Sequence, residues 1–186
     1  SSTTAVTMSI VMILAGFGYK ISAVPFHFWT PDVYEGAPLS ITAYLSVAPK
    51  AAALALMIRF FHQTFADGGA MKGLDSVSLT QLPWPEILSL LAVATMTLGN
   101  VVALQQNSIK RMLAYSSIAH AGYMLMALCV ATESALISVM FYLFTYLFMN
   151  LGAFFILIYA NNTMNVETIK DFNGFGKKSP LLSACM

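Results

Sequence analysis

Charge is scarce in this sequence of 186 residues. Only 9% of the residues are charged, with 9 Lys+Arg against 8 Asp+Glu, whereas soluble domains contain about 25% charged residues. So few charges could not cover the surface of an ordinary soluble enzyme, and a nucleic-acid binder would need a clustered basic face. Cysteine is scarce too. The two cysteines, Cys129 and Cys185, form neither a zinc-ligand spacing nor a disulfide framework.

Long apolar runs make up most of the chain, and its 58% hydrophobic content excludes disorder. The length of each run is close to that of a helix that crosses a ~30 Å hydrocarbon core, which needs ~20 residues. The runs are too long for strands of a membrane barrel and lack their strict alternation. No Met precedes Ser1, so we expect an internal fragment of a longer polypeptide. We predict an all-α fold, a polytopic transmembrane helix bundle in a single membrane domain, with spans at about 5–28, 38–61, 85–104, 112–132 and 134–160 and the start of a sixth at 181.

The polar segments between the runs indicate an orientation. Residues 30–38 are predicted to form a tight connection, 62–84 a longer loop, 105–111 a short basic loop and 161–180 the longest loop. Successive loops alternate between the two sides of a membrane, and basic residues favour the cytoplasmic side. The side with 30–38, 105–111 and 161–180 is therefore predicted to be cytoplasmic. It carries Lys110, Arg111, Lys170, Lys177 and Lys178, against Arg59 and Lys72 on the other side.

Two lysines fall inside the apolar runs. Lys50 lies in the middle of its run, where a lysine costs about 2.5–3.5 kcal/mol on insertion and is functional by default. Counting from the turn expected at Gly36 puts Lys20 at a similar depth. Pro25 and Pro49 accompany the lysines, and a proline inside a span frees a backbone carbonyl. Two lysines at similar depth suit a proton relay. Alternatively, Lys20 snorkels to the interface and Lys50 is a static partner for an acid.

A histidine adds a third titratable group. His120 lies in the run at 112–132, and Ser116 precedes it by one helical turn on the same face. Histidine titrates near neutrality and can pass protons, but a serine and a histidine can equally hydrogen-bond between helices as packing contacts. His27 and His62 have no ligand-spaced partners for a metal, and no cofactor motif occurs in the sequence.

Two stretches of the sequence resemble known signatures. Residues 20–28 read Lys-Ile-Ser-Ala-Val-Pro-Phe-His-Phe and residues 29–38 read Trp-Thr-Pro-Asp-Val-Tyr-Glu-Gly-Ala-Pro. Together they closely resemble the most characteristic stretch of the antiporter-like membrane subunits of respiratory complex I, in the form typical of subunit N of NADH-quinone oxidoreductase (the counterpart of mitochondrial subunit 2). Residues 109–123, Ile-Lys-Arg-Met-Leu-Ala-Tyr-Ser-Ser-Ile-Ala-His-Ala-Gly-Tyr, resemble the family's second signature. The resemblance covers essentially the whole chain, which corresponds to the central part of such a subunit.

The resemblance implies a proton-translocating subunit built from two inverted repeats, each with a broken helix. By similarity, Lys20 matches the key lysine of the first broken helix and Lys50 the lysine of the next helix. His120 matches a histidine on the central hydrophilic axis, and Lys110 a basic residue at the start of the second signature. The glutamate that pairs with the first lysine would lie on a preceding helix, and the ionisable residue of the second broken helix beyond Met186.

The resemblance also implies the context of the chain. It would be a subunit of a proton-translocating NADH-quinone oxidoreductase without a redox centre of its own, so NADH, FMN, iron–sulfur clusters and quinone are expected in other subunits. Its expected partners are other membrane subunits of complex I and the lipid bilayer. The expected location is a bacterial cytoplasmic membrane rather than an organellar inner membrane. Nucleic acid is not expected as a partner. Two alternatives stay open. One is a subunit of a related multisubunit sodium/proton antiporter, membrane-bound hydrogenase or photosynthetic complex I; the other is a structural membrane module whose lysines only fix helix packing.

Overall fold

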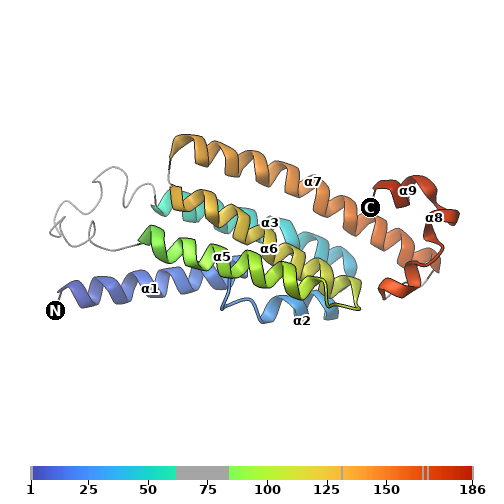
Figure 1. The fold of residues 1–186 in the computed structure, drawn as a ribbon, viewed down its shortest axis with the longest axis horizontal. Helices are drawn as coiled ribbons and strands as arrows, with labels where there is room; N and C mark the ends of the chain where they lie inside the picture. The colour runs from blue at the N-terminus through green and yellow to red at the C-terminus, as the bar shows by residue number, and fades with distance from the viewer. Residues whose placement is uncertain (1, 62–83, 131, 165, 167, 186) are drawn as a thin grey trace.

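The computed structural model describes residues 2–61, 84–130, 132–164, 166 and 168–185. Its long helices run side by side along one axis (Figure 1). Among the described residues, α3, α5, α6 and α7 are long and apolar enough to cross a membrane, which confirms the predicted all-α membrane bundle. The elements are α1 (Ser2–Ile21), α2 (Trp29–Gly36), α3 (Leu39–Phe61), α5 (Trp84–Ala103), α6 (Ile109–Val130), α7 (Glu133–Met164), the 3₁₀ helix η2 (Ile169–Phe172), α8 (Phe175–Lys178) and α9 (Pro180–Cys185).

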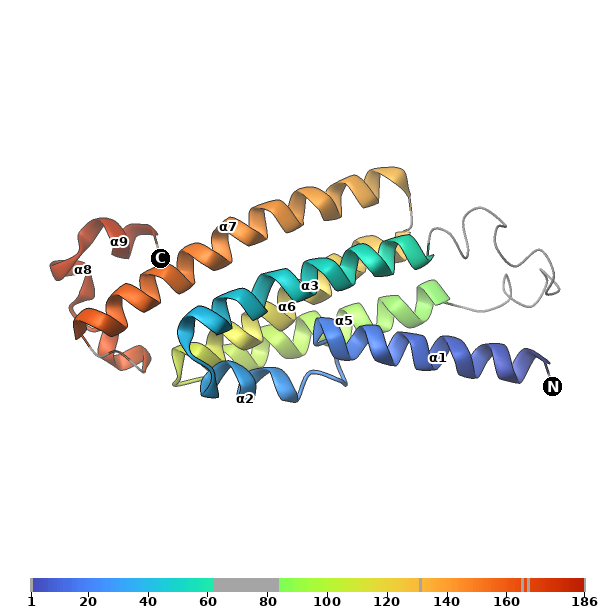
Figure 2. The same cartoon turned by 180° about the vertical axis from the view of Figure 1, so that it is seen from behind.

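The first predicted span is broken rather than continuous. A helix was expected to reach Phe28 and a tight connection to follow at 30–38; both expectations were wrong, because α1 ends at Ile21 and α2 occupies Trp29–Gly36. Ser22 adopts a positive φ of 66° that a helix cannot contain, and Pro25 has no N–H to continue the ladder. The two helices follow one another along the bundle axis, beside α3 and α5 (Figures 1 and 2). α1 thus ends part-way along the bundle.

The other boundaries differ less from the sequence expectations. α3 begins at Leu39 and continues as one helix through Pro49. α7 has 32 residues and extends to Met164, so it includes the first part of the loop expected at 161–180. A helix begins at Pro180, next to the expected start of the sixth run at 181. The loop expected at 62–84 lies outside the described residues, apart from Trp84.

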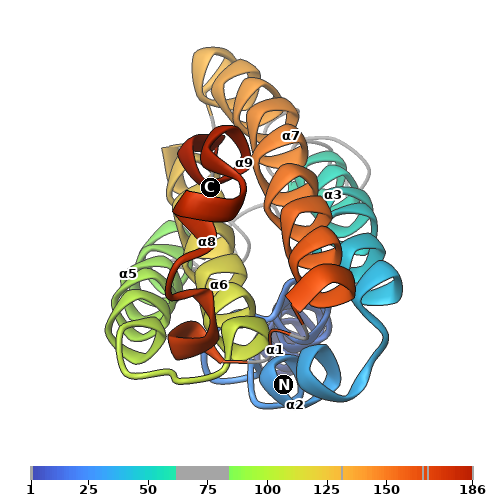
Figure 3. The same cartoon turned by 90° about the vertical axis from the view of Figure 1, so that its right-hand side faces the viewer.

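Helix α6 is the centre of the bundle. It contacts α2, α3, α5 and α7, and the view along the bundle axis shows it between α5 on one side and α3 and α7 on the other (Figure 3). Glycines bring α5 and α6 together: a Cβ on Gly99 would lie 2.6 Å from the backbone nitrogen of Ala119, and one on Gly122 would lie 2.7 Å from that of Met96. Such close approach of small residues is the usual way in which membrane helices pack.

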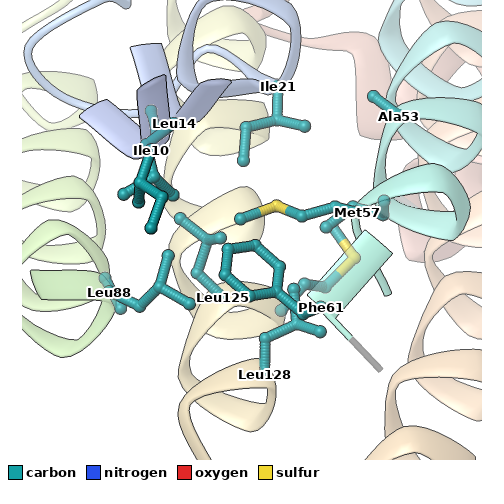
Figure 4. Packing of buried hydrophobic residues seen from close by; sticks show 13 residues of the cluster. Ile10, Leu14, Ile21, Ala53, Met57, Phe61, Leu88, Leu125 and Leu128 are labelled. Atoms are coloured by element: carbon teal, nitrogen blue, oxygen red, sulfur yellow. The ribbon is translucent and has the colours of Figure 1, made fainter. Parts of the chain in front are cut away.

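Two apolar clusters fill the interior at different levels. The first joins α1, the second half of α3, the start of α5 and the second half of α6; Figure 4 shows Ile10 and Leu14 facing Leu88 and Leu125, with Met57 and Phe61 beside them. The second joins α2 and the start of α3 with the first half of α6 and the second half of α7, and includes Tyr34, Ala43, Ile109, Ala114, Phe154, Ile156, Leu157 and Ala160. On α3, α6 and α7, the residues between these two levels include buried polar side chains. These are Ser46, Lys50, Ser117 and Asn150.

Candidate functional site

Lys50 is the centre of the polar layer. It lies midway along α3, and only 2% of its surface is exposed. Its ammonium donates to the backbone carbonyl of Ser117 at 3.1 Å and to the Ser117 hydroxyl. No carboxylate among the described residues pairs with Lys50. An ammonium buried in a membrane without a counter-charge costs several kcal/mol unless other groups solvate it, and here the residue that solvates it is Ser117 of α6.

A second set of bonds holds the turn of α3 that precedes Lys50. The Tyr146 hydroxyl donates to the Ser46 carbonyl at 3.1 Å, and the Asn150 amide donates to the Ser46 hydroxyl at 2.5 Å. The Ser46 hydroxyl in turn donates to the carbonyl of Ala43 at 2.7 Å. All three polar side chains are buried, so their mutual hydrogen bonds offset the cost of removing them from water. α7 thereby fixes the backbone from which Lys50 projects.

His120 extends the polar layer from α6 towards α7. Its Nδ1 lies 2.6 Å from the hydroxyl of Tyr142, and the rings of His120 and Tyr146 are 5.2 Å apart between centroids. Tyr146 therefore stands between His120 and the Ser46 turn of α3. Because His120 is one turn from Ser117 on α6, the two lie on the same side of that helix. The structure thus brings His120 and Lys50 into one cluster, as a relay requires.

Tyr34 reaches the same cluster from α2. Its side chain is fully buried, and its hydroxyl lies 3.3 Å from that of Ser117. Its ring packs edge-on against Phe154 of α7, and its carbonyl accepts from Thr42 of α3 at 3.3 Å. We call Tyr34, Ser46, Lys50, Ser117, His120, Tyr142, Tyr146 and Asn150 the central polar cluster.

Lys20 lies apart from this cluster. It is an exposed residue in the last turn of α1, and within the described part of the chain no hydrogen bond joins it to the central polar cluster. It lines a groove of about 630 Å³ between α1 and α3, together with Gly16, Tyr44, Ala48 and Pro49. Larger apolar side chains, including Phe17 and Leu56, complete its lining.

Lys110, near the start of α6, contacts the C-terminal end of α2. Its ammonium donates to the backbone carbonyls of Glu35 and Ala37, both at 3.2 Å. A helix leaves its last carbonyls without partners, and a cation there also opposes the negative end of the helix dipole. The neighbouring Arg111 donates to Asp32 at 2.9 Å and to Glu35 at 2.8 Å. The two basic residues thus clamp α2 onto the start of α6.

Comparison with known proteins shows the family to which this chain belongs. The profile described as "NADH:quinone oxidoreductase/Mrp antiporter, TM" matches residues 1–186. The chain belongs to this family. It is 51% identical over 182 residues to NADH-quinone oxidoreductase subunit N 2 of Sorangium cellulosum, covering 97% of this chain and 35% of that protein. The chain therefore spans about a third of the length of the curated relatives it matches.

Solved structures show the same fold. A chain of respiratory complex I from Thermus thermophilus is 35% identical, with a TM-score of 0.68, over 92% of this chain and 34% of that one. A chain of an archaeal membrane-bound sulfane sulfur reductase is 27% identical, with a TM-score of 0.81, over 98% of this chain and 35% of that one. Both likenesses are to subunits of multi-subunit membrane complexes.

The residues of the central polar cluster that were not predicted from the sequence include Ser117, as the partner of Lys50, Tyr142 and Tyr146. Ser116 and His120 share a face of α6, as expected, but Ser116 makes no side-chain hydrogen bond among the described residues, and the partner of Lys50 is Ser117. A signal for Ser117 existed, because it falls on the same helical stripe as the small residues Ala114 and Ala121 of this span. Tyr142 and Tyr146 gave no such signal, since aromatics are common throughout α7. The described residues contain no group of three His, Cys, Asp or Glu side chains that could hold a metal ion.

Proposed function

We propose that this chain forms the central part of the proton-translocating membrane subunit of a bacterial NADH-quinone oxidoreductase. The observation that carries the proposal is Lys50, which is buried midway along a membrane-spanning helix and has hydroxyl and carbonyl partners in place of a carboxylate. A lysine in such a position can bind and release a proton, because burial penalises its charged form. A lysine that only packed helices together would have the same cost of burial in the membrane without a functional benefit.

The proposed path runs through Lys20, Lys50 and His120. Redox chemistry elsewhere in the complex changes the electrostatics of the buried charges. Lys20 holds a proton while a carboxylate from another part of the full protein occupies the groove beside it. Loss of that pairing drives a proton to Lys50, and from there through water and His120 towards the second half of the subunit. The two apolar clusters, above and below the central polar cluster, keep protons from leaking along the helices.

The chemistry of electron transfer belongs to other parts of the complex. In the proposed function this chain transfers protons and carries out no redox step. NADH, FMN, iron–sulfur clusters and quinone bind other subunits, and the partners of this chain are the neighbouring membrane subunits and the lipid of the bacterial cytoplasmic membrane.

A sodium/proton antiporter subunit is the alternative that the fold also allows, because other ion-translocating complexes share it. Lysines favour protons over sodium, since a sodium ion needs oxygen ligands and an ammonium cannot supply them. Dependence of transport on sodium would therefore favour the alternative.

The deciding experiment uses Lys50→Met in the full-length protein, assembled in its complex, in inside-out membrane vesicles. NADH-driven acidification and NADH oxidation are recorded together, after assembly has been checked. We expect acidification to fall roughly tenfold or more, as loss of a proton-transfer group does. Lys178→Met serves as the matched control, because Lys178 is an exposed residue of α8. Equal rates for Lys50→Met and the control, with normal assembly, would overturn the proposal and make Lys50 a packing residue.

A further inference from the structure

We infer that Tyr34 and Ser117 are positioning residues, whose hydroxyls join the Lys50 ammonium to α2 and so couple the broken segment that follows Lys20 to Lys50. The inference deepens the proposed function and rests on it. It concerns a connection between the two lysines, which do not contact one another.

The first step is the geometry at Ser117. Its side chain is buried, and both hydrogen bonds of the Lys50 ammonium to α6 end on this one residue. The Ser117 hydroxyl also lies 3.3 Å from the Tyr34 hydroxyl. A hydroxyl has one donor and two acceptor sites, so Ser117 can accept from Lys50 and still bond Tyr34. Ser117 therefore links α2, α3 and α6 at one point.

The second step is the rigid attachment of Tyr34 to α2. The Tyr34 side chain is fully buried against Phe154, and its carbonyl accepts from Thr42. The end of α2 is clamped by Lys110 and Arg111. Tyr34 thus moves with α2 as one body rather than as a free rotamer.

The third step is the connection from α2 back to Lys20. Thr30 of α2 donates to the Ser22 hydroxyl at 2.6 Å, and the Trp29 indole donates to the Tyr19 carbonyl at 3.0 Å. Ser22 and Tyr19 flank Lys20 in the sequence. A rearrangement at Lys20 that shifts the end of α1 therefore reaches α2 through these bonds, and reaches Lys50 through Tyr34 and Ser117.

The test compares Ser117→Ala, Ser117→Thr and Tyr34→Phe in the full-length protein, assembled in its complex in inside-out vesicles. Ser117→Ala and Tyr34→Phe remove the hydroxyl and keep most of the packing. We expect each to lower NADH-driven acidification about tenfold with assembly intact. Ser117→Ala removes the hydroxyl that accepts from the Lys50 ammonium, and Tyr34→Phe removes the hydroxyl that bonds and orients Ser117. Ser117→Thr restores the hydroxyl and should restore most of the pumping. Ser116→Ala is the matched control, since it removes a neighbouring hydroxyl that lies outside the central polar cluster.

Epistasis separates this inference from the function on which it rests. If the hydroxyls act through Lys50, Ser117→Ala adds no further loss in a Lys50→Met background, because groups that act as a unit are not additive. If Lys50→Met lowers pumping but Ser117→Ala and Tyr34→Phe behave like Ser116→Ala, the inference is wrong and the proposed function stands. If Lys50→Met itself has no effect, the proposed function fails and the inference fails with it.

Discussion

Nδ1 of His120 lies 2.6 Å from the hydroxyl of Tyr142, across the interface of α6 and α7. This hydrogen bond fixes the orientation of the imidazole, and with it which ring nitrogen is free to exchange a proton. A histidine in a relay needs such an orienting partner, but the same kind of bond also joins helices as a packing contact, so a variant must separate the two roles.

Tyr142→Phe tests the role of this partner. The change keeps the ring and removes the hydroxyl, so we expect assembly to be kept and NADH-driven acidification to fall several-fold, because the imidazole loses its fixed orientation. The measurement is acidification of inside-out vesicles beside NADH oxidation. Tyr159→Phe, at a partly exposed position of the same helix, is the control. A Tyr142→Phe protein that pumps like the control would show that the bond serves packing alone.

Lys110→Arg distinguishes a cap from a proton site. Arginine keeps several N–H donors for the carbonyls of Glu35 and Ala37, but it does not release its proton in proteins. If Lys110 caps α2, Lys110→Arg should keep most of the pumping while Lys110→Met loses it. If Lys110 exchanges protons, both variants should lose it. The contacts on the carbonyls lead us to expect the first result.

Gly99→Ala should destabilise the bundle. A Cβ at Gly99 meets the backbone of Ala119 at 2.6 Å, and backbone cannot move aside as a flexible side chain can. We expect a cost of about 1–3 kcal/mol or more, typical of overpacking, seen as a lower temperature of unfolding in detergent. Gly152→Ala is the matched control, because no atom lies within 4 Å of a Cβ there. Equal melting temperatures for the two variants would contradict the close packing of α5 and α6.

Asp32→Asn should have little effect on stability. The ion pair with Arg111 is 2.9 Å long, but 73% of the Asp32 side chain is exposed, and Arg111 keeps its bond to Glu35. Exposed ion pairs contribute about 0–1 kcal/mol and are screened by salt. The check is the unfolding temperature at low and high salt. A large loss that salt does not reduce would mean that Asp32 supports α2 in another way.

The sequence alone predicted that Lys50 lies deep in its span, because the physics behind that prediction is local. Length and hydropathy place the apolar runs, and a lysine in the middle of such a run has a desolvation cost that no choice of neighbours removes entirely. His120 was predicted in the same way, as a titratable group within a span. The resemblance implied that the helix carrying Lys20 is broken, but helix α2 was missed, because Trp29–Gly36 contains proline, glycine and acids that are typical of turns. An eight-residue helix is marginal by itself, and contacts of Tyr34, Lys110 and Arg111 between α2 and α6 stabilise it.

The sequence by itself determined the all-α bundle and the depth of Lys50 within its span. The tertiary structure decided which groups surround Lys50. Ser116 and Ser117 are adjacent and chemically identical, yet they point about 100° apart around α6. Only the rotation of α6, which its close packing at Gly99 and Gly122 fixes, turns Ser117 towards α3 and α2. That rotation depends on contacts between residues far apart in the chain. The stripe of small residues at Ala114, Ser117 and Ala121 indicates which face of α6 packs, but not which helices it meets.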